Sequence, residues 1–282
     1  MPNVMCDTSC ALAAVMPDLL FEVAEQLPLG DRQCTFLTSL YLRMEFMRRW
    51  ILTGIRIYIA ARRRGSLSWA ISWASEEMGS REPKAVAKWA AEYDRVKSRA
   101  KLGEAERCEQ FGKLVLRCAR DYDLLFRMVN PSKTKCRRGQ LAFDYSARST
   151  REALRDFYQR FSAEDHACGL AELLSPEHRC PKARPVVDAN PTDVPSNARR
   201  AFKALHVKLN ELFSTCRVPS CGSCSALGDL LIALEQPRRT TLYTVDHLFD
   251  ALCPLLGKPH KRLASIRAVA RKKDILSDLL GD

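Results

Sequence analysis

The sequence has few of the short motifs that identify an enzyme. Its 282 residues contain no glycine-rich phosphate-binding loop, no pair of CxxC motifs and no motif around a catalytic nucleophile. The obvious carboxylate pairs, Glu76 with Glu77 and Asp121 with Asp123, would point in different directions on a helix. We therefore expect a protein that acts without catalysis, and we infer no small-molecule substrate.

Lysine and arginine are absent from the first 31 residues, where the charged side chains are Asp7, Asp18, Glu22, Glu25 and Asp31. A secretory signal peptide starts with positive charge, so this acidic start argues against export. A membrane-spanning helix needs about twenty nearly uninterrupted apolar residues, and arginines interrupt the long apolar stretch that follows. We expect an intracellular protein, either cytoplasmic or nuclear.

The segment 32–64 reverses this balance, because it contains eight arginines against the single acid Glu45. Apolar residues from Leu37 to Ile59 recur every three or four positions, which predicts one long amphipathic helix. A basic amphipathic helix can bind a partner helix or an anionic membrane surface. The candidate residues for that surface are Arg49, Arg56, Arg62, Arg63 and Arg64.

Helical patterns dominate the rest of the chain. Apolar residues at alternating steps of three and four between Cys108 and Val129 predict a helix of a bundle, and Ser149 with Glu152 forms a capping box. Strand signals are scarce, with 230–234 and 240–244 as the short candidates. The sequence predicts an all-α protein, an irregular helical bundle with a smaller helical C-terminal region.

Prolines suggest where the chain divides. Four of them lie in the stretch 181–198, which excludes a long helix there. We therefore expect a helical bundle over 1–180, a proline-rich linker over 181–198 and a helical C-terminal region with a cysteine-rich turn over 199–282.

The formal net charge of +12 supports an alternative function in nucleic-acid binding. Two basic clusters, one in a loop and one near the C-terminus, could contact phosphates. Their residues are Lys133, Lys135, Arg137, Arg138, Lys258, Lys261, Arg262, Arg271, Lys272 and Lys273.

The chain has twelve cysteines, and three of them resemble part of a metal site. Cys216, Cys221 and Cys224 are spaced CxxxxCxxC, and His206 is a candidate fourth ligand for a structural zinc ion. Buried thiols that pack as small apolar groups are the competing interpretation. No other cofactor is predicted.

The N-terminal half resembles the HeLo-type helical domains of fungal cell-death and incompatibility proteins. The similar features are an apolar first helix, an Asp-led turn followed by Cys, a helix with an Arg-Trp pair and a Gly-Ile step. They correspond to 11–27, Asp31 with Cys34, Leu40 and Leu42 with Arg49 and Trp50, and Gly54 with Ile55; the segment 135–145 and the helix that starts at Arg151 resemble the basic turn and late helix of that domain. The resemblance implies a non-catalytic regulatory domain that acts on a protein partner or an anionic membrane surface.

A second resemblance is to the F-box, a short helical adaptor domain. The residues that resemble its first helix and turn are Met16, Pro17, Leu19, Leu20, Glu22, Val23, Leu27 and Asp31. This resemblance implies a Skp-type protein partner.

Overall fold

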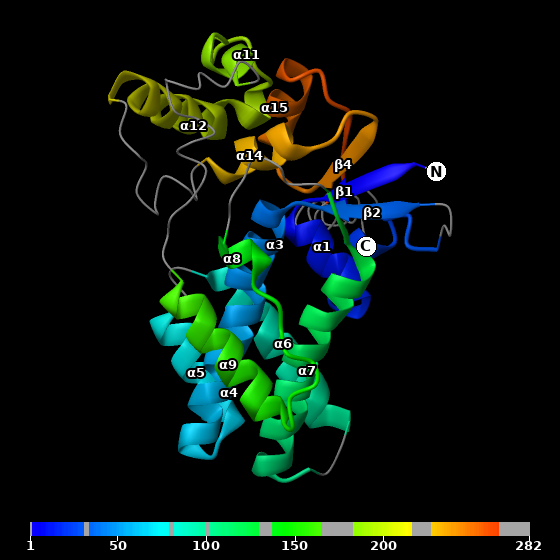
Figure 1. Cartoon of the computed structure of the whole chain (residues 1–282), viewed down its shortest axis with the longest axis vertical. Helices are drawn as coiled ribbons and strands as arrows, with labels where there is room; N and C mark the ends of the chain where they lie inside the picture. The colour runs from blue at the N-terminus through cyan, green and yellow to red at the C-terminus, as the bar shows by residue number, and fades with distance from the viewer. Residues whose placement is uncertain are drawn as a thin grey trace, which may run out of the picture. The chain divides into compact units, whose positions relative to one another are not determined.

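The chain forms two compact units, each assembled from segments that are distant in the sequence (Figure 1). The computed structural model describes residues 2–30, 34–78, 82–99, 102–129, 137–164, 183–215 and 227–264. Unit 1 comprises Met1–Leu42, Phe126–Cys136 and Cys168–Asp282, and unit 2 comprises Arg43–Leu125 and Arg137–Ala167. This division does not coincide with the boundaries expected at 180 and 199.

Unit 1 is built on a five-stranded parallel sheet in the order β3-β2-β1-β4-β5. The middle strand, β1, pairs with β2 on one side and with β4 on the other, and Val4, Met5 and Cys6 in it are buried. A short apolar run is typical of a parallel strand that is covered on both faces. The strands are β1 (Asn3–Cys6), β2 (Thr35–Thr38), β3 (Arg127–Met128), β4 (Thr240–Thr244) and β5 (His260–Arg262).

Helices lie in the connections between these strands. The buried Gln236 side chain links two of the connections, because its Nε2 donates to the carbonyl oxygens of Thr240 and Pro259. The described helices of unit 1 are α1 (Thr8–Val15), η1 (Pro17–Leu19), α2 (Phe21–Ala24), α11 (Arg184–Val187), α12 (Ser196–Thr215), α14 (Gly228–Glu235) and α15 (Phe249–Leu255).

The predicted high helix content is confirmed, but the all-α class must be corrected because of the sheet in unit 1. The strand candidate at 240–244 is β4, whereas 230–234 lies inside α14. The described strands have at most five residues and pair with partners far away in the sequence, for example Asn3 with Thr240. Such pairing leaves no local periodicity to recognise.

The described part of unit 2 is helical (Figure 1). The predicted amphipathic helix is confirmed from Leu40 onward, whereas Thr35–Thr38 before it is strand β2. The helices are α3 (Leu40–Phe46), which begins in unit 1, the π-helical turn η2 (Met47–Ile51), α4 (Leu52–Arg64), α5 (Leu67–Glu77), α6 (Pro83–Arg99), α7 (Glu104–Leu125), α8 (Arg137–Gln140) and α9 (Thr150–Ala163).

The apolar stripe of this long helix forms the core of unit 2. Met47, Ile51 and Ile55 are completely buried, and α4 packs against α5, α7 and α9. The approach of α4 to α7 is close, because a Cβ at Gly112 would lie 2.6 Å from the ring of Tyr58. The irregular turn η2 leaves the Trp50 carbonyl oxygen to accept a hydrogen bond from Trp89 Nε1 at 2.8 Å.

No helix in the described part of the chain is both long enough and apolar enough to cross a membrane.

A buried ion pair fixes the start of this unit. The Arg43 side chain, 7% exposed, donates Nε and Nη2 to the two carboxylate oxygens of Asp123 at 2.8 and 3.0 Å. Its Nη1 donates to the carbonyl oxygens of Gly139 and Leu141, and the Tyr145 hydroxyl donates to Asp123. The guanidinium group therefore joins α3, α7, α8 and the chain that directly follows α8.

We expect Asp123→Asn to destabilise the protein because it leaves the buried Arg43 charge without its counter-ion. Breaking such a partly buried pair should lower the free energy of unfolding by about 2–3 kcal/mol. The matched control is Asp121→Asn on the same helix, whose carboxylate pairs with Arg117 near the surface, and it should cost less than about 0.5 kcal/mol. Urea unfolding of both variants measures the difference, and equal costs would contradict the assigned role of Arg43.

Candidate functional site

The carboxyl ends of β1 and β4 form the place in unit 1 where a ligand is expected. From β1 the sheet extends through β2 to β3 in one direction and through β4 to β5 in the other. In open parallel sheets, ligands bind outside the carboxyl ends of the strands where the strand order reverses, since the connections there diverge. The reversal in this sheet lies between β1 and β4.

Asp7 occupies this position, directly after β1. Its Oδ1 accepts a hydrogen bond from the Cys10 backbone N–H at 2.7 Å, which caps α1. Its Oδ2 accepts from the Thr244 hydroxyl at 2.6 Å and from the Val245 backbone N–H at 3.2 Å. The residue is only 6% exposed, so three hydrogen bonds hold its carboxylate in one orientation.

Asp246 follows the end of β4 at the same edge of the sheet. Its backbone N–H donates to the Thr244 hydroxyl oxygen at 2.9 Å, and its Oδ1 accepts from the Leu248 backbone N–H at 2.8 Å. Its side chain is exposed. The single hydroxyl of Thr244 therefore links the Asp7 carboxylate to the backbone of Asp246.

A third carboxylate, Asp229, lies in the first turn of α14. This helix leads into β4, so it runs antiparallel to the strands and begins at their carboxyl edge. Gly228 beside it lies against Tyr41, close after the end of β2, and a Cβ at this glycine would collide with the Tyr41 hydroxyl. The first turn of α14 therefore belongs to the same edge as Asp7.

Within the described residues, no three Asp, Glu, His or Cys side chains stand close enough together to hold a metal ion by themselves. Mg²⁺ does not require such a group, because it commonly takes one or two carboxylates and completes its shell with water and substrate phosphate. Asp7 and Asp246 provide two carboxylates at one edge of the sheet, which is the number of protein ligands that such a site uses.

A second cluster in unit 1 surrounds Asp250 of α15. Its carboxylate accepts hydrogen bonds from His260 Nε2 at 3.1 Å and from Asn197 Nδ2 at 3.0 Å, and it pairs with Arg262. Burial raises the pKa of Asp250, but the hydrogen bonds from His260 and Asn197 and the charge of Arg262 outweigh it, so the pKa lies below its ordinary value. This carboxylate joins α12, α15 and β5.

The predicted nucleic-acid residues in β5 and just before it make structural contacts. Arg262 pairs with Asp250, Lys258 Nζ donates to the carbonyl oxygens of Leu234 and Gln236, and the Lys261 ammonium lies 5.4 Å from the Tyr243 ring centroid. In unit 2, Arg137 lies in α8. Five further candidates, Lys133, Lys135, Arg271, Lys272 and Lys273, lie outside the described residues.

Arg138, the last of that predicted set, donates to the carbonyl oxygen of Glu164 through Nε and Nη2. Its guanidinium carbon lies 5.1 Å from the Phe161 ring centroid. These contacts attach α8 to the end of α9.

The predicted zinc ligands Cys216, Cys221 and Cys224 also lie outside the described residues. The proposed fourth ligand, His206, is in α12, where Nε2 donates to the Val187 carbonyl oxygen at 2.8 Å and Nδ1 lies 3.2 Å from Asn210 Nδ2. Both ring nitrogens therefore have partners.

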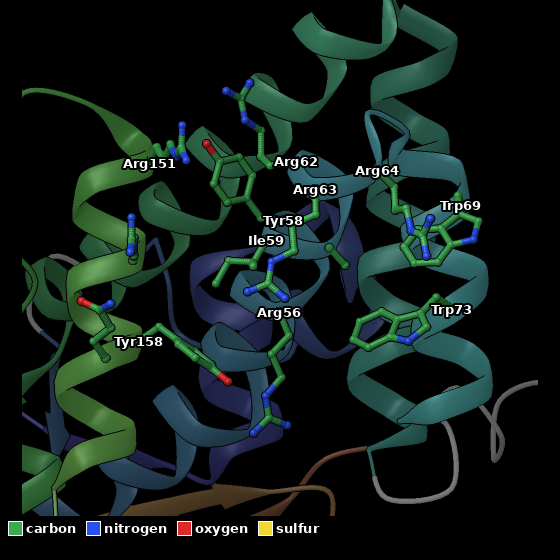
Figure 2. Close-up of a pocket in the computed structure, with 13 residues that line it drawn as sticks. Arg56, Tyr58, Ile59, Arg62, Arg63, Arg64, Trp69, Trp73, Arg151 and Tyr158 are labelled. Carbon is green, nitrogen blue, oxygen red and sulfur yellow. The ribbon is translucent and has the colours of Figure 1, made fainter.

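The predicted partner surface is divided in the structure. Arg49 pairs with Glu45 at 2.9 Å on the same helix. Arg56, Arg62, Arg63 and Arg64 instead line a pocket of about 870 Å³ in unit 2, which Figure 2 shows. Among the other residues that line this pocket, the sequence prediction missed Trp69 and Trp73 from α5 and Arg151, Arg155 and Tyr158 from α9. Their spacing of four residues on each helix was the available signal.

The carboxylates at the sheet edge were also missed. The short apolar run Val4-Met5-Cys6 is followed directly by Asp7, and the strand candidate 240–244 is followed by Val245 and Asp246. An aspartate just after each of two short candidate strands was the signal that could have indicated two strand ends. No protein-family model, curated protein or solved structure matches the chain.

We expect Thr244→Val to destabilise unit 1, since valine preserves the shape of the side chain but removes its hydroxyl. The Asp7 carboxylate loses a donor and the Asp246 N–H loses its acceptor, which should cost about 1–3 kcal/mol. Thr241→Val in the same strand is the control, because Thr241 is half-buried and makes no such link; it should change stability little. Thermal unfolding distinguishes the two, and an unaffected Thr244 variant would contradict the assigned link.

The lowered pKa of Asp250 predicts a pH-dependent contribution to stability. A carboxylate whose pKa is lower in the folded state stabilises the protein above its unfolded pKa, and this contribution is lost as the pH falls through the folded value. Asp250→Asn should therefore lower the urea midpoint at pH 7, and the gap to wild type should narrow below about pH 4. Asp188→Asn, at an exposed ion pair with Arg184, should show no comparable gap. A gap for Asp250→Asn that stays constant with pH would contradict the assignment.

Proposed function

We propose that the protein hydrolyses phosphodiester bonds of nucleic acid with a divalent cation held at the carboxyl edge of the sheet in unit 1. The observation that carries this proposal is the position of Asp7 and Asp246, at the ends of the two strands between which the strand order reverses. Thr244 couples the two residues through one hydroxyl group.

The hydrogen bonding of these side chains leaves lone pairs that a cation could use. A carboxylate offers about four lone-pair sites, and Asp7 uses three of them for Cys10, Thr244 and Val245. Asp246 uses Oδ1 to accept from Leu248, and its side chain is exposed. Each aspartate therefore keeps an oxygen lone pair that could bind a hard cation, and such a cation commonly completes its shell with water and phosphate oxygens.

Such a cation supplies the chemistry that the side chains lack. When bound there by Asp7 and Asp246, it would polarise a phosphoryl oxygen and lower the pKa of a bound water. In the hydrolysis, a water oxygen bonds to phosphorus as the bond from phosphorus to the leaving oxygen breaks; one proton of that water passes to solvent, and the leaving oxygen takes a proton from solvent. Asp229 lies at the same edge of the sheet, in the first turn of α14.

Nucleic acid is the favoured substrate because of charge. The chain has an excess of twelve positive charges, and unit 2 presents six arginines around one pocket. Cationic surfaces of this kind bind polyphosphate backbones by releasing counter-ions. The expectation of a non-catalytic protein, which rested on the absence of short motifs, stays a prediction that the cleavage test below decides.

The hypothesis of a HeLo-like domain on a membrane has less support. Interfacial binding needs an apolar helix face that is free to enter the lipid. The apolar stripe of the long helix is mostly in the core, where Met47, Ile51 and Ile55 are buried. The F-box-like adaptor stays a prediction, which a pull-down with a Skp-type protein tests.

The test is cleavage of end-labelled single-stranded RNA and DNA by the purified chain in Mg²⁺, in Mn²⁺ and in EDTA. We expect cleavage with either cation and none in EDTA. Asp246→Asn should reduce the rate by about 100-fold or more, since it removes a charged ligand, while its amide oxygen can still accept from the Leu248 N–H.

The matched control is Asp188→Asn, which changes an exposed carboxylate that pairs with Arg184 in the same unit and should cleave at the wild-type rate. Circular dichroism should show all three proteins folded. If the wild type cleaves neither nucleic acid with either cation, or if Asp246→Asn cleaves as fast as wild type, the proposal is wrong.

A further inference from the structure

The arginine-lined pocket lies entirely in unit 2, between three helices. Figure 2 shows Arg62, Arg63 and Arg64 extending from the end of α4, with Trp69 and Trp73 on α5 and Arg151 and Tyr158 on the other side. Its volume of about 870 Å³ falls within the range of ligand pockets.

The charge of this pocket has one sign. Six of its lining residues are arginines and none is an acid. Elsewhere in unit 2 arginines have acidic partners, such as Arg43 with Asp123 and Arg49 with Glu45. Within the described ranges, no ion pair joins any of the six pocket arginines to a carboxylate. Clustered like charges repel one another and oppose folding, so an anionic ligand would relieve an existing cost.

The aromatic side chains give the pocket a second property. The rings of Trp69 and Trp73 are nearly parallel, with 6.3 Å between centroids and an interplanar angle of 15°. Trp69 is 40% exposed, which is unusual for so large an apolar ring, and the guanidinium carbon of Arg64 lies 5.2 Å from its centroid. The bases of single-stranded nucleic acids stack on exposed aromatic rings that lie beside arginines, since every base has an apolar face.

We propose that this pocket binds a single-stranded segment of nucleic acid, with phosphates on the arginines and a base stacked on Trp69 or Trp73. Guanidinium groups suit this role because their planar donors bind phosphate oxygens in pairs. A bilayer surface is a poorer occupant, because it is flat and cannot enter a concave site between three helices. The binding site is separate from the carboxylates of unit 1 and does not rest on their catalysis.

The test is binding of a dye-labelled ten-nucleotide single-stranded RNA in EDTA, measured by fluorescence anisotropy. EDTA removes divalent cations, so cleavage cannot contribute to the signal. The double variant Arg63→Gln with Arg155→Gln should weaken binding about tenfold or more, and the slope of log K against log salt should become shallower by about 1–2. Trp73→Ala should weaken binding about tenfold with little change in that slope.

The matched control removes two positive charges from elsewhere in unit 2, by Lys113→Gln with Arg117→Gln on the exposed side of α7. It should change affinity less than about threefold. The pocket arginine variant should also melt at or above the wild-type temperature, because repulsion is relieved, whereas a structural role would lower its melting temperature.

Equal binding by the pocket and control variants would overturn the proposal. A wild-type protein that binds no oligonucleotide would also overturn the proposal. If that protein co-sediments with phosphatidylserine vesicles instead, the arginines would be assigned to binding an anionic membrane surface. Cleavage by unit 1 is measured separately, so failure of this proposal and of the proposed function can be distinguished.

Discussion

The hydroxyl group of Thr244 is the contact on which the organisation of unit 1 depends. It donates to the Asp7 carboxylate and accepts from the Asp246 backbone N–H. A charge as deeply buried as that of Asp7 is costly unless hydrogen bonds replace water, and the donors come from α1, from β4 and from the turn after β4. Satisfying one carboxylate therefore fixes the ends of the two central strands and the start of the first helix together.

The helices could be predicted from the sequence far better than the sheet, and the reason is the distance between interacting residues. The stripe through Met47, Ile51 and Ile55 and the cap at Ser149 depend on neighbours within one or two helical turns. The pairing of Asn3 with Thr240 instead brings together residues from opposite ends of the chain. Their short apolar runs contain no information about that partner, so the sequence predicted an all-α protein and missed the sheet.

The candidate sites show the same limit. Arg62, Arg63 and Arg64 could be found because they are consecutive, but Trp69 and Arg151 join them only through the packing of α4 against α5 and α9. A run of basic residues can also suggest a free charged surface when the acidic partners of those residues lie far away in the sequence. Arg262 stands in an acid-free run, yet the fold supplies Asp250 as its counter-ion.

The π-helical turn η2 determines which way the pocket arginines face. A turn closed by i→i+5 hydrogen bonds holds one residue more than an α-helical turn, so every residue after it is rotated by about 100° relative to an uninterrupted α-helix. Trp89 donates to the Trp50 carbonyl oxygen within this turn. If the present sequence formed regular α-helix through Met47–Ile51, Ile55 would turn away from the core and Arg56 and Arg62 would turn away from the pocket. The irregular turn is therefore what keeps the apolar stripe and the arginines of α4 on their present faces.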